Sequence, residues 1–170
     1  MTISLGILTV SDRSFSGERA DSSGPALARA AEQHGWRIAR TAIIADERLK
    51  ISSTLVDWCD GTENLDLILT TGGTGFSPRD ITPEATFAVI ERSAPGMAEA
   101  MRLASLKITP HAMLSRGIAG IRGATLIINL PGSPKAAQEN FEVVAPVLTH
   151  AVELLKNNPN AEAGHRTTHA

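Results

Sequence analysis

Short apolar runs alternate with longer amphipathic segments along most of this chain. Four of the runs predict β-strands, because each spans only a few residues, is rich in aliphatic side chains and leads into polar residues or glycine. They cover residues 3–10, 36–45, 65–70 and 124–130. Apolar runs of this kind are typical of strands in a parallel sheet that is covered on both faces.

Helical patterns fill the stretches between these strands. The first helix is expected to start at Pro25, with Ser22 or Ser23 as its cap, and to end at Gly35. The second follows residue 46, and its apolar residues recur at helical spacing on one face. These residues are Ile51, Leu55, Trp58 and Cys59. Residues 11–23, before the first helix, are expected to form a loop.

Proline residues organise the second half of the chain. A helix is expected to open at Thr82 and to break at residues 94–96, after which residues 97–107 are helical again. The last helix runs towards Lys156, and we expect Pro146 to kink or split it, because proline removes a backbone donor. The chain beyond is polar, so we expect one domain over residues 1–156 and a polar tail over residues 157–170.

The alternation of strands and helices predicts an α/β fold with a largely parallel central sheet. Ligands bind to such sheets beyond the carboxyl ends of the strands. Polar or glycine-rich segments follow all four predicted strands, namely Ser11 with Asp12, Asp46, residues 72–75 and residues 131–134. Because the carboxyl ends of parallel strands share one edge, we place the candidate site there.

The loop over residues 70–82 has the sequence TTGGTGFSPRDIT. Closely spaced glycines let backbone N–H groups point into a common hollow and let an anion approach without a Cβ in the way. The loop lacks the Gly-Lys-Ser/Thr of a nucleotide P-loop and the G-x-G-x-x-G of dinucleotide-binding folds. A tight turn is the simpler alternative, but the crowding of Gly72, Gly73, Thr74 and Gly75 with charged residues favours an anion site.

Asp46 and Asp80 are each expected at the carboxyl edge of the sheet, beside the start of a helix. Asp46 also fits the role of a helix N-cap, and Asp80 that of a loop carboxylate bonded to nearby backbone groups. Two carboxylates beside a polyphosphate are together able to hold Mg²⁺, which takes only one or two protein carboxylates and keeps much of its water. Such a metal neutralises charge on a transferring phosphoryl or nucleotidyl group.

The segment Pro131, Gly132, Ser133 and Pro134 ends the fourth strand and begins a helix, with Ser133 as the expected cap. A helix N-terminus also offers free N–H groups to an anion. Arg116, in the loop before the last strand, carries a fork of donors that suits phosphate. By itself, each of these features is more typical of a surface loop than of a ligand contact.

Composition narrows the function classes. The chain carries 16 Lys and Arg against 18 Asp and Glu, and this lack of basic excess argues against nucleic acid and against an anionic membrane surface as partners. The single cysteine, Cys59, excludes an intrachain disulfide, and the N-terminus lacks the features of a secretory signal. We therefore expect a cytoplasmic protein. The histidines show no metal-ligand spacing, and they form no nucleophile set with Ser or Cys.

Six strings carry a family resemblance. The longest is LILTTGGTGFSPRDITPEAT at residues 67–86. The others are LTVSD at 8–12, DSSGP at 21–25, SLKITP at 105–110, AMLSR at 112–116 and GIRGATLIINLPGSP at 120–134. Together they resemble the molybdopterin adenylyltransferases of molybdenum cofactor biosynthesis, a family of stand-alone bacterial enzymes and of the G domains of gephyrin and the plant cofactor protein. The resemblance extends from residue 3 to about residue 156.

The resemblance implies a single three-layer α/β/α domain and a homotrimer. It implies that AMP is transferred from ATP to the terminal phosphate of molybdopterin, with Mg²⁺ as cofactor and pyrophosphate as the second product. A downstream molybdenum-insertion protein is a possible partner. The nucleophile is then a phosphate oxygen of the substrate, so this reaction requires no nucleophilic Ser or Cys.

The resemblance also assigns residues. Asp46 and Asp80 are the two carboxylates needed for transfer and for Mg²⁺, and residues 72–75 cradle phosphates. The residues implied to line the pterin and nucleotide pocket are Asp12, Ser23, Ser115, Pro131, Gly132, Ser133 and Pro134. Ser133 stands where relatives often carry Asn or Gln, which leaves the backbone role of this loop intact.

Three alternatives to this enzyme stay open. The first is a paralogue of the same fold that binds molybdopterin without transferring AMP, and the presence of both Asp46 and Asp80 counts against it. The second is a regulatory or scaffold module, which a compact chain with no linker disfavours. The third is an unrelated nucleotidyltransferase with a similar loop, which would act on ATP independently of pterin.

Overall fold

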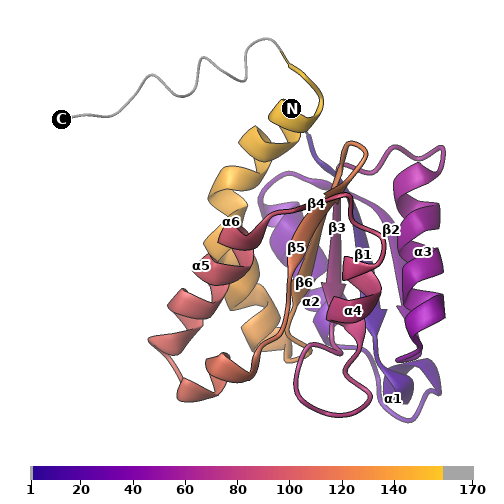
Figure 1. Ribbon diagram of the computed structural model, residues 1–170, viewed down its shortest axis with the longest axis vertical. Helices are drawn as coiled ribbons and strands as arrows, with labels where there is room; N and C mark the ends of the chain where they lie inside the picture. The colour runs from indigo at the N-terminus through magenta and orange to yellow at the C-terminus, as the bar shows by residue number, and fades with distance from the viewer. Residues whose placement is uncertain (1, 159–170) are drawn as a thin grey trace.

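The computed structural model describes residues 2–158 and is built on a six-stranded sheet with the order β2-β1-β3-β6-β5-β4 (Figure 1). Its parallel part consists of β1 (Ser4–Val10), β2 (Arg37–Ile44), β3 (Leu67–Thr71) and β6 (Thr125–Leu130). Two antiparallel strands, β5 (Ala119–Arg122) and β4 (Arg92–Ser93), extend the sheet beyond β6. The carboxyl ends of the four parallel strands therefore share one edge.

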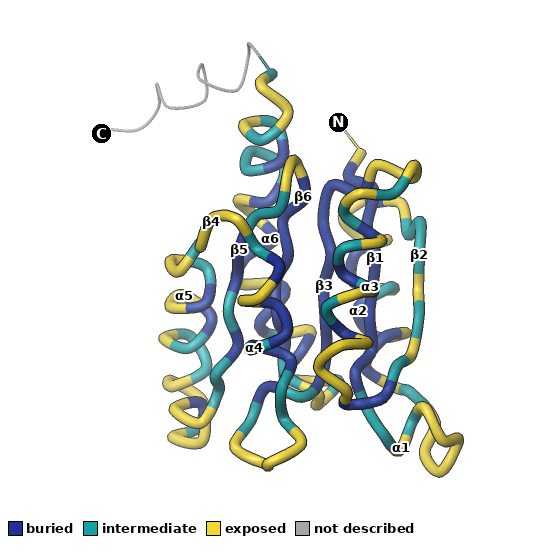
Figure 2. The backbone as a smooth tube through the Cα atoms, turned by 45° about the vertical axis from the view of Figure 1, so that its right-hand side comes forward, coloured by how far each residue is buried: buried dark blue, intermediate teal, exposed yellow. Residues whose placement is uncertain are grey.

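Helices cover both faces of the sheet. One face carries α2 (Ser23–Gln33), α5 (Pro95–Leu106) and α6 (Pro134–Leu155), and the other carries α3 (Arg48–Asp60) and α4 (Thr82–Phe87). The side chains of β1 supply both cores, with Leu5 and Ile7 in the first and Leu8 and Val10 in the second. Figure 2 shows β1, β3 and β6 buried along their length, whereas β2 at the sheet edge is partly exposed. The predicted three-layer α/β/α class is confirmed.

Several short elements differ from the prediction. Residues 11–23, predicted as a loop, contain the one-turn helix α1 (Asp12–Phe15), and the 3-10 turn η1 (Pro110–Leu114) was not expected. The helix predicted to extend to residues 94–96 is α4, which ends at Phe87, and β4 follows before residue 94. β4 has two residues and pairs with β5 through Arg92 opposite Ile121. Its strand conformation depends on a distant partner, which local hydrophobic periodicity does not encode.

Pro146 does not split α6, contrary to expectation, since the helix runs without interruption from Pro134 to Leu155. The proline lies on the exposed side of the helix, while Val144 and Leu148 on either side of it are buried in the core. The carbonyl that loses its partner to proline is therefore able to bond with water, and the buried side chains hold the helix in place.

The end of α6 is anchored at the amino edge of the sheet. Lys156 Nζ lies 2.5 Å from Asp66 Oδ1, and Asp66 Oδ2 accepts the backbone N–H of Ser4 over 2.9 Å. Most of the predicted polar tail, residues 159–170, lies outside the described residues. Within residues 2–158, none of the helices has the combined length and apolar character needed to cross a membrane.

Candidate active site

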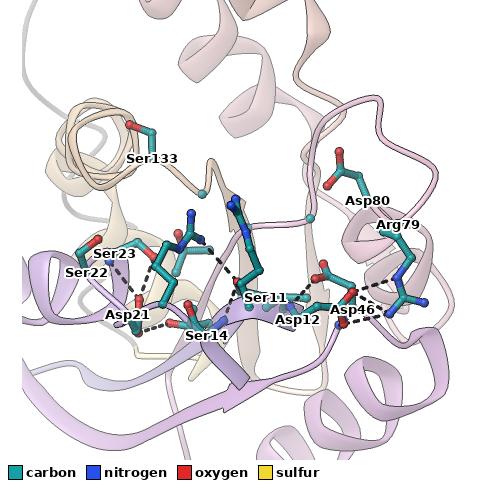
Figure 3. Close-up of a pocket in the computed structure, with 18 of the residues that line it drawn as sticks. Ser11, Asp12, Ser14, Asp21, Ser22, Ser23, Asp46, Arg79, Asp80 and Ser133 are labelled. Carbon is teal, nitrogen blue, oxygen red and sulfur yellow. Dashed lines mark hydrogen bonds and ion pairs between the residues drawn. The ribbon is translucent and has the colours of Figure 1, made fainter. Parts of the chain in front are cut away.

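Loops at the carboxyl edge of the parallel strands enclose a polar cavity of about 610 Å³ (Figure 3). Its walls come from the segments that follow β1, β2, β3 and β6, as the parallel topology predicts. The sequence-predicted residues that line it are Asp12, Ser23, Asp46, Gly72, Gly73, Asp80, Gly132, Ser133 and Pro134.

A second cavity of about 420 Å³ adjoins the first and is lined more by apolar side chains, among them Ile108, Ala112 and Leu114. The remaining predicted site residues line this one, namely Thr74, Gly75, Ser115 and Pro131. Gly73, Asp80 and Gly132 line both cavities. The predicted residues are therefore divided between two neighbouring cavities that meet at the glycine loop.

Asp12 and Asp46 hold the ends of β1 and β2 together beside the first cavity. The backbone N–H of Asp12 donates to Asp46 Oδ2 over 2.8 Å, and the backbone N–H of Asp46 donates to Asp12 Oδ1 over 3.0 Å. Arg79 adds two bonds of 2.9 Å to Asp12, from Nε to Oδ2 and from Nη2 to Oδ1 (Figure 3). The alternative role of Asp46 as a helix cap is wrong, because the cap of α3 is Glu47 and it makes no side-chain cap bond.

The pKa values of these two aspartates shift in opposite directions. Burial raises the pKa of Asp46 above its ordinary value of 3.8, and repulsion from Asp12 and Asp80 adds to the rise despite the hydrogen bond from the Asp12 N–H. Burial also raises the pKa of Asp12, but the bonds from Arg79 and from the Asp46 N–H, with the Arg79 charge, outweigh it and lower that pKa. The charged form of Asp46 is thus disfavoured mainly by burial and further by the two neighbouring carboxylates, although the Arg79 charge offsets part of this.

Gly72 and Gly73 give the loop a backbone conformation that other residues adopt only with strain, with φ of +102° and +62°. A Cβ on Gly72 would collide with the carbonyl oxygen of Val10, and a Cβ on Gly73 would collide with Thr82 Oγ1 and lie 3.0 Å from Asp46 Oδ1. Thr82 at the start of α4 fixes this turn, since its Oγ1 donates to Gly72 O over 2.9 Å and its N–H to Gly73 O over 3.0 Å. The loop is therefore a tight turn, and its two glycines form a part of the cavity wall that carries no side chains.

Asp80 lies at the other end of this loop. Its Oδ2 accepts the N–H of Ser77 over 2.8 Å, so the local bonding considered as an alternative does occur. Oδ1 of Asp80 and Oδ1 of Asp46 make no hydrogen bond among the residues that the structure describes. Each carboxylate therefore has one oxygen engaged by the backbone and one available to a ligand.

Arg116, considered from sequence as a phosphate contact, is instead bound to the protein itself. Its Nε donates to Gly75 O over 2.7 Å, its Nη2 donates to Asp80 O and its Nη1 forms an ion pair with Glu84. The backbone N–H of Arg116 donates to Thr74 O over 2.9 Å. Its guanidinium donors are thus occupied by the glycine loop and the first turn of α4.

The cap predictions for the two helices that begin beside the first cavity differ in outcome. Ser133 caps α6 as expected, and its side chain accepts from the N–H of Ala136. Ser22 lies at the N-cap position of α2, also as predicted, but neither Ser22 nor Ser23 caps the helix through its side chain. Asp21 does so in their place, since its Oδ1 accepts the N–H groups of Ser23 and of Gly24 over 3.0 and 3.1 Å. Asp21 Oδ2 also accepts from Thr9 Oγ1 over 2.7 Å, which ties α2 to β1.

Among the residues of the first cavity that sequence reasoning missed are three charged ones, namely Asp21, Arg13 and Arg19. An available signal was the position of Asp21 just before a predicted helix, where Asp is as good a cap as Ser. The two arginines lie in the stretch predicted as a loop, and nothing in their spacing indicates that they face the cavity.

A metal held by the protein alone is not supported. Within residues 2–158 no group of three or more His, Cys, Asp or Glu side chains is arranged to hold a metal ion. The pair Asp46 and Asp80 does fit a Mg²⁺ that also binds substrate phosphates, because that ion needs only one or two protein carboxylates. The free Oδ1 atoms and the repulsion between the Asp46 and Asp80 carboxylates agree with that requirement.

Comparison with known proteins connects this geometry to a family. Residues 6–150 match the family model described as a probable molybdopterin binding domain. The chain is 45% identical over 159 residues to the molybdopterin adenylyltransferase of Helicobacter pylori strain J99, an alignment that covers 92% of this chain and 90% of the relative. It is 43% identical to the molybdenum cofactor synthesis protein cinnamon of Drosophila melanogaster, with 99% of this chain but only 28% of that relative covered.

The fold also agrees with a solved structure whose name, like those of the relatives above, refers to molybdopterin biosynthesis. The molybdopterin biosynthesis enzyme MoaB from Thermus thermophilus superimposes with a TM-score of 0.87 at 51% sequence identity. The match covers 93% of this chain and 99% of that one. Sequence and structure therefore identify the same group of relatives.

Proposed function

Since the chain belongs to the molybdopterin adenylyltransferase family of molybdenum cofactor biosynthesis, we propose that it transfers AMP from ATP to the terminal phosphate of molybdopterin. In this reaction a phosphate oxygen of molybdopterin attacks the α-phosphorus of ATP. One phosphorus–oxygen bond forms, the bond between the α-phosphorus and the bridging oxygen to the β-phosphorus breaks, and pyrophosphate leaves. The products are adenylyl-molybdopterin and pyrophosphate.

The observation that carries this proposal is the meeting of two cavities at Gly73, Asp80 and Gly132. A transfer between two phosphorylated substrates needs two binding sites whose phosphate ends converge. Each cavity is large enough to take a substantial part of one substrate, at about 610 and 420 Å³. The shared wall consists of two glycines and one carboxylate, where close approach of phosphates and of a cation is sterically open.

The side chains of the first cavity fit roles in this reaction. The backbone of residues 72–75, opened by the two positive-φ glycines, is proposed to cradle phosphates. Asp46 and Asp80 would hold Mg²⁺ through their free oxygens, and the ion would neutralise charge on the phosphates. Arg13 and Arg19 line the same cavity and add positive charge near the departing pyrophosphate.

Catalysis of this kind depends on alignment and charge stabilisation. The substrate supplies its own nucleophile, so the protein's task is to hold two phosphates in line and to stabilise the charge that develops between them. The protein then needs no nucleophilic Ser or Cys of its own for this reaction.

The proposal includes the wider setting of the enzyme. It comprises a homotrimer in the cytoplasm, with a downstream molybdenum-insertion protein as the recipient of its product, as the family resemblance implies. Neither nucleic acid nor membrane is a partner in this proposal.

The test is release of pyrophosphate from ATP and Mg²⁺ by the purified protein, with and without molybdopterin. We expect release that depends on molybdopterin and is lost in Asp80→Asn and Asp46→Asn, with pterin binding largely retained. Asp57→Asn is the matched control, because Asp57 is an exposed carboxylate on α3 that pairs only with Arg40 at the surface. Tight pterin binding without pyrophosphate release would identify a binding paralogue, and release independent of pterin an unrelated nucleotidyltransferase.

A further inference from the structure

Residues 75–80 form the exposed part of the glycine loop, and they carry Asp80 between the two cavities. The segment contributes little to the core, since Phe76 is 66% exposed and its neighbours up to Arg79 are exposed too. Among residues 2–158, the Asp80 carboxylate accepts a hydrogen bond only from Ser77 of the same segment. Its position relative to the cavities is therefore set by whatever holds the segment to the rest of the protein.

Two arginines hold this segment. Arg79 reaches Asp12 from the middle of it, but the Arg79 side chain is 59% exposed, and exposed ion pairs contribute little. Arg116 is 34% exposed and binds the two ends, Gly75 O and Asp80 O. The Arg116 guanidinium is thus the firmer of the two connections.

We propose that Arg116 is a positioning residue for adenylyl transfer, which fixes residues 75–80 so that the Asp80 carboxylate stands at the junction of the cavities. This inference rests on the proposed function. Ser115, directly before Arg116, lines the second cavity. Arg116 therefore ties the wall of one cavity to the carboxylate that both cavities share.

The arrangement requires arginine in particular. Three guanidinium nitrogens serve three acceptors that come from Gly75, Asp80 and Glu84, and a single ammonium group has no matching fork. Glu84 Oε2 is buried and has no hydrogen-bond partner in the described chain. Arg116 is thus also the charge that compensates the Glu84 carboxylate, so its replacement has a structural effect that must be separated from the effect on Asp80.

Arg122 provides the matched control for Arg116→Lys. It also uses three nitrogens, two on the Asp60 carboxylate over 3.0 and 2.6 Å and one on Val89 O over 3.1 Å. It lies at the end of β5 and lines neither cavity. Arg122→Lys therefore removes a comparable set of bonds away from the site.

Two measurements on these variants test the proposal. The first is steady-state pyrophosphate release, in which we expect kcat to fall at least about tenfold in Arg116→Lys, with the KM for molybdopterin within about twofold, and to stay near the wild-type value in Arg122→Lys. The second is amide hydrogen exchange without substrates. Here Arg116→Lys is expected to speed exchange across residues 75–81, and Arg122→Lys to leave it unchanged.

Glu84→Gln in the Arg116→Lys background separates stability from positioning. Lysine keeps the positive charge but not the fork, so the Glu84 carboxylate loses its directed bond to the guanidinium. Replacement of this carboxylate by an amide is expected to recover thermal stability without recovering kcat. Recovery of kcat together with stability would overturn the proposal, and so would a kcat for Arg116→Lys equal to that for Arg122→Lys. If the wild-type protein releases no pyrophosphate, the proposed function fails, and unchanged loop exchange in Arg116→Lys would independently refute the role of Arg116.

Discussion

Asp12 and Asp46 each accept a hydrogen bond from the backbone of the other, over 2.8 and 3.0 Å. This exchange joins the ends of β1 and β2 and leaves Asp46 Oδ1 beside Gly73. The same carboxylate is buried and repelled by Asp12 and Asp80, which raises its pKa. The ionised Asp46 carboxylate, which the proposed reaction needs, therefore lowers the stability of the protein when no ligand is bound.

Asp46→Asn is expected to lower the transfer rate by about 100-fold or more and yet to raise the thermal midpoint at neutral pH. The amide oxygen of Asn is still able to accept the Asp12 N–H, while the repulsion from Asp12 and Asp80 is removed. Thermal unfolding without nucleotide or Mg²⁺ measures the second effect. A clear fall in the midpoint would show that the ionised carboxylate stabilises this corner of the fold.

The stability gained by Asp46→Asn depends on pH. The pKa of Asp46 in the folded protein lies above its ordinary value of 3.8, so the folded state binds this proton more tightly than the unfolded state. The unfavourable contribution of Asp46 is absent below 3.8, grows with pH between the two pKa values and is complete above the folded one. We expect the difference in unfolding free energy between variant and wild type to rise over that window. A difference that falls with rising pH would contradict the shift.

Gly73 and Gly123 form a matched pair for substitution by alanine, since their φ angles are +62° and +55°. Alanine at either position brings the strain of the left-handed conformation, about 1 kcal/mol. A Cβ at Gly123 meets nothing within 4 Å, whereas one at Gly73 would clash with Thr82 Oγ1 and lie 3.0 Å from Asp46 Oδ1. We expect Gly123→Ala to lose only stability, and Gly73→Ala to lose more stability and most of the activity. Equal activity in the two variants would argue against close approach of a ligand at Gly73.

Cys59 is expected to be unreactive in the folded protein. Burial, with the charge of Asp60 as a smaller cause, raises the pKa of its thiol to about 11 from an ordinary value of 9.0. The thiolate population under mildly alkaline conditions is then about 100-fold lower than in the unfolded chain. Alkylation followed by mass spectrometry, with and without denaturant, measures this difference. Comparable rates in the two conditions would mean that α3 opens readily.

The fold was predictable wherever local pattern and burial coincide. The strand predicted over residues 3–10 is β1 to within one residue, because a short run this rich in aliphatic residues is typical of a buried strand in a parallel sheet. The edge at which Asp46 and the glycine loop meet follows from that topology alone. The family resemblance, read from the loop and its neighbouring strings, is confirmed by the comparisons.

The remaining details depend on contacts between distant residues. Arg116 has a residue type that suits phosphate and carbonyl groups equally, and its acceptors lie 32 to 41 positions away in the chain. Asp21, Ser22 and Ser23 are all good caps, and only the approach of Thr9 distinguishes Asp21 from the two serines. β4 exists because β5 lies beside it. Periodicity in one sequence carries none of this information.

Ser4, at the start of β1, and Lys156, just after α6, both bind Asp66, on the side of the sheet opposite the cavities (Figure 1). A segment joined before β1 or after α6 would therefore start at the edge of the sheet opposite the cavities. The domain resembles a cassette, because the start of β1 and the end of α6 lie at one edge of the sheet and the cavities lie at the other. Such a cassette is able to be fused to a second catalyst, in tandem or by insertion, without rebuilding either active centre.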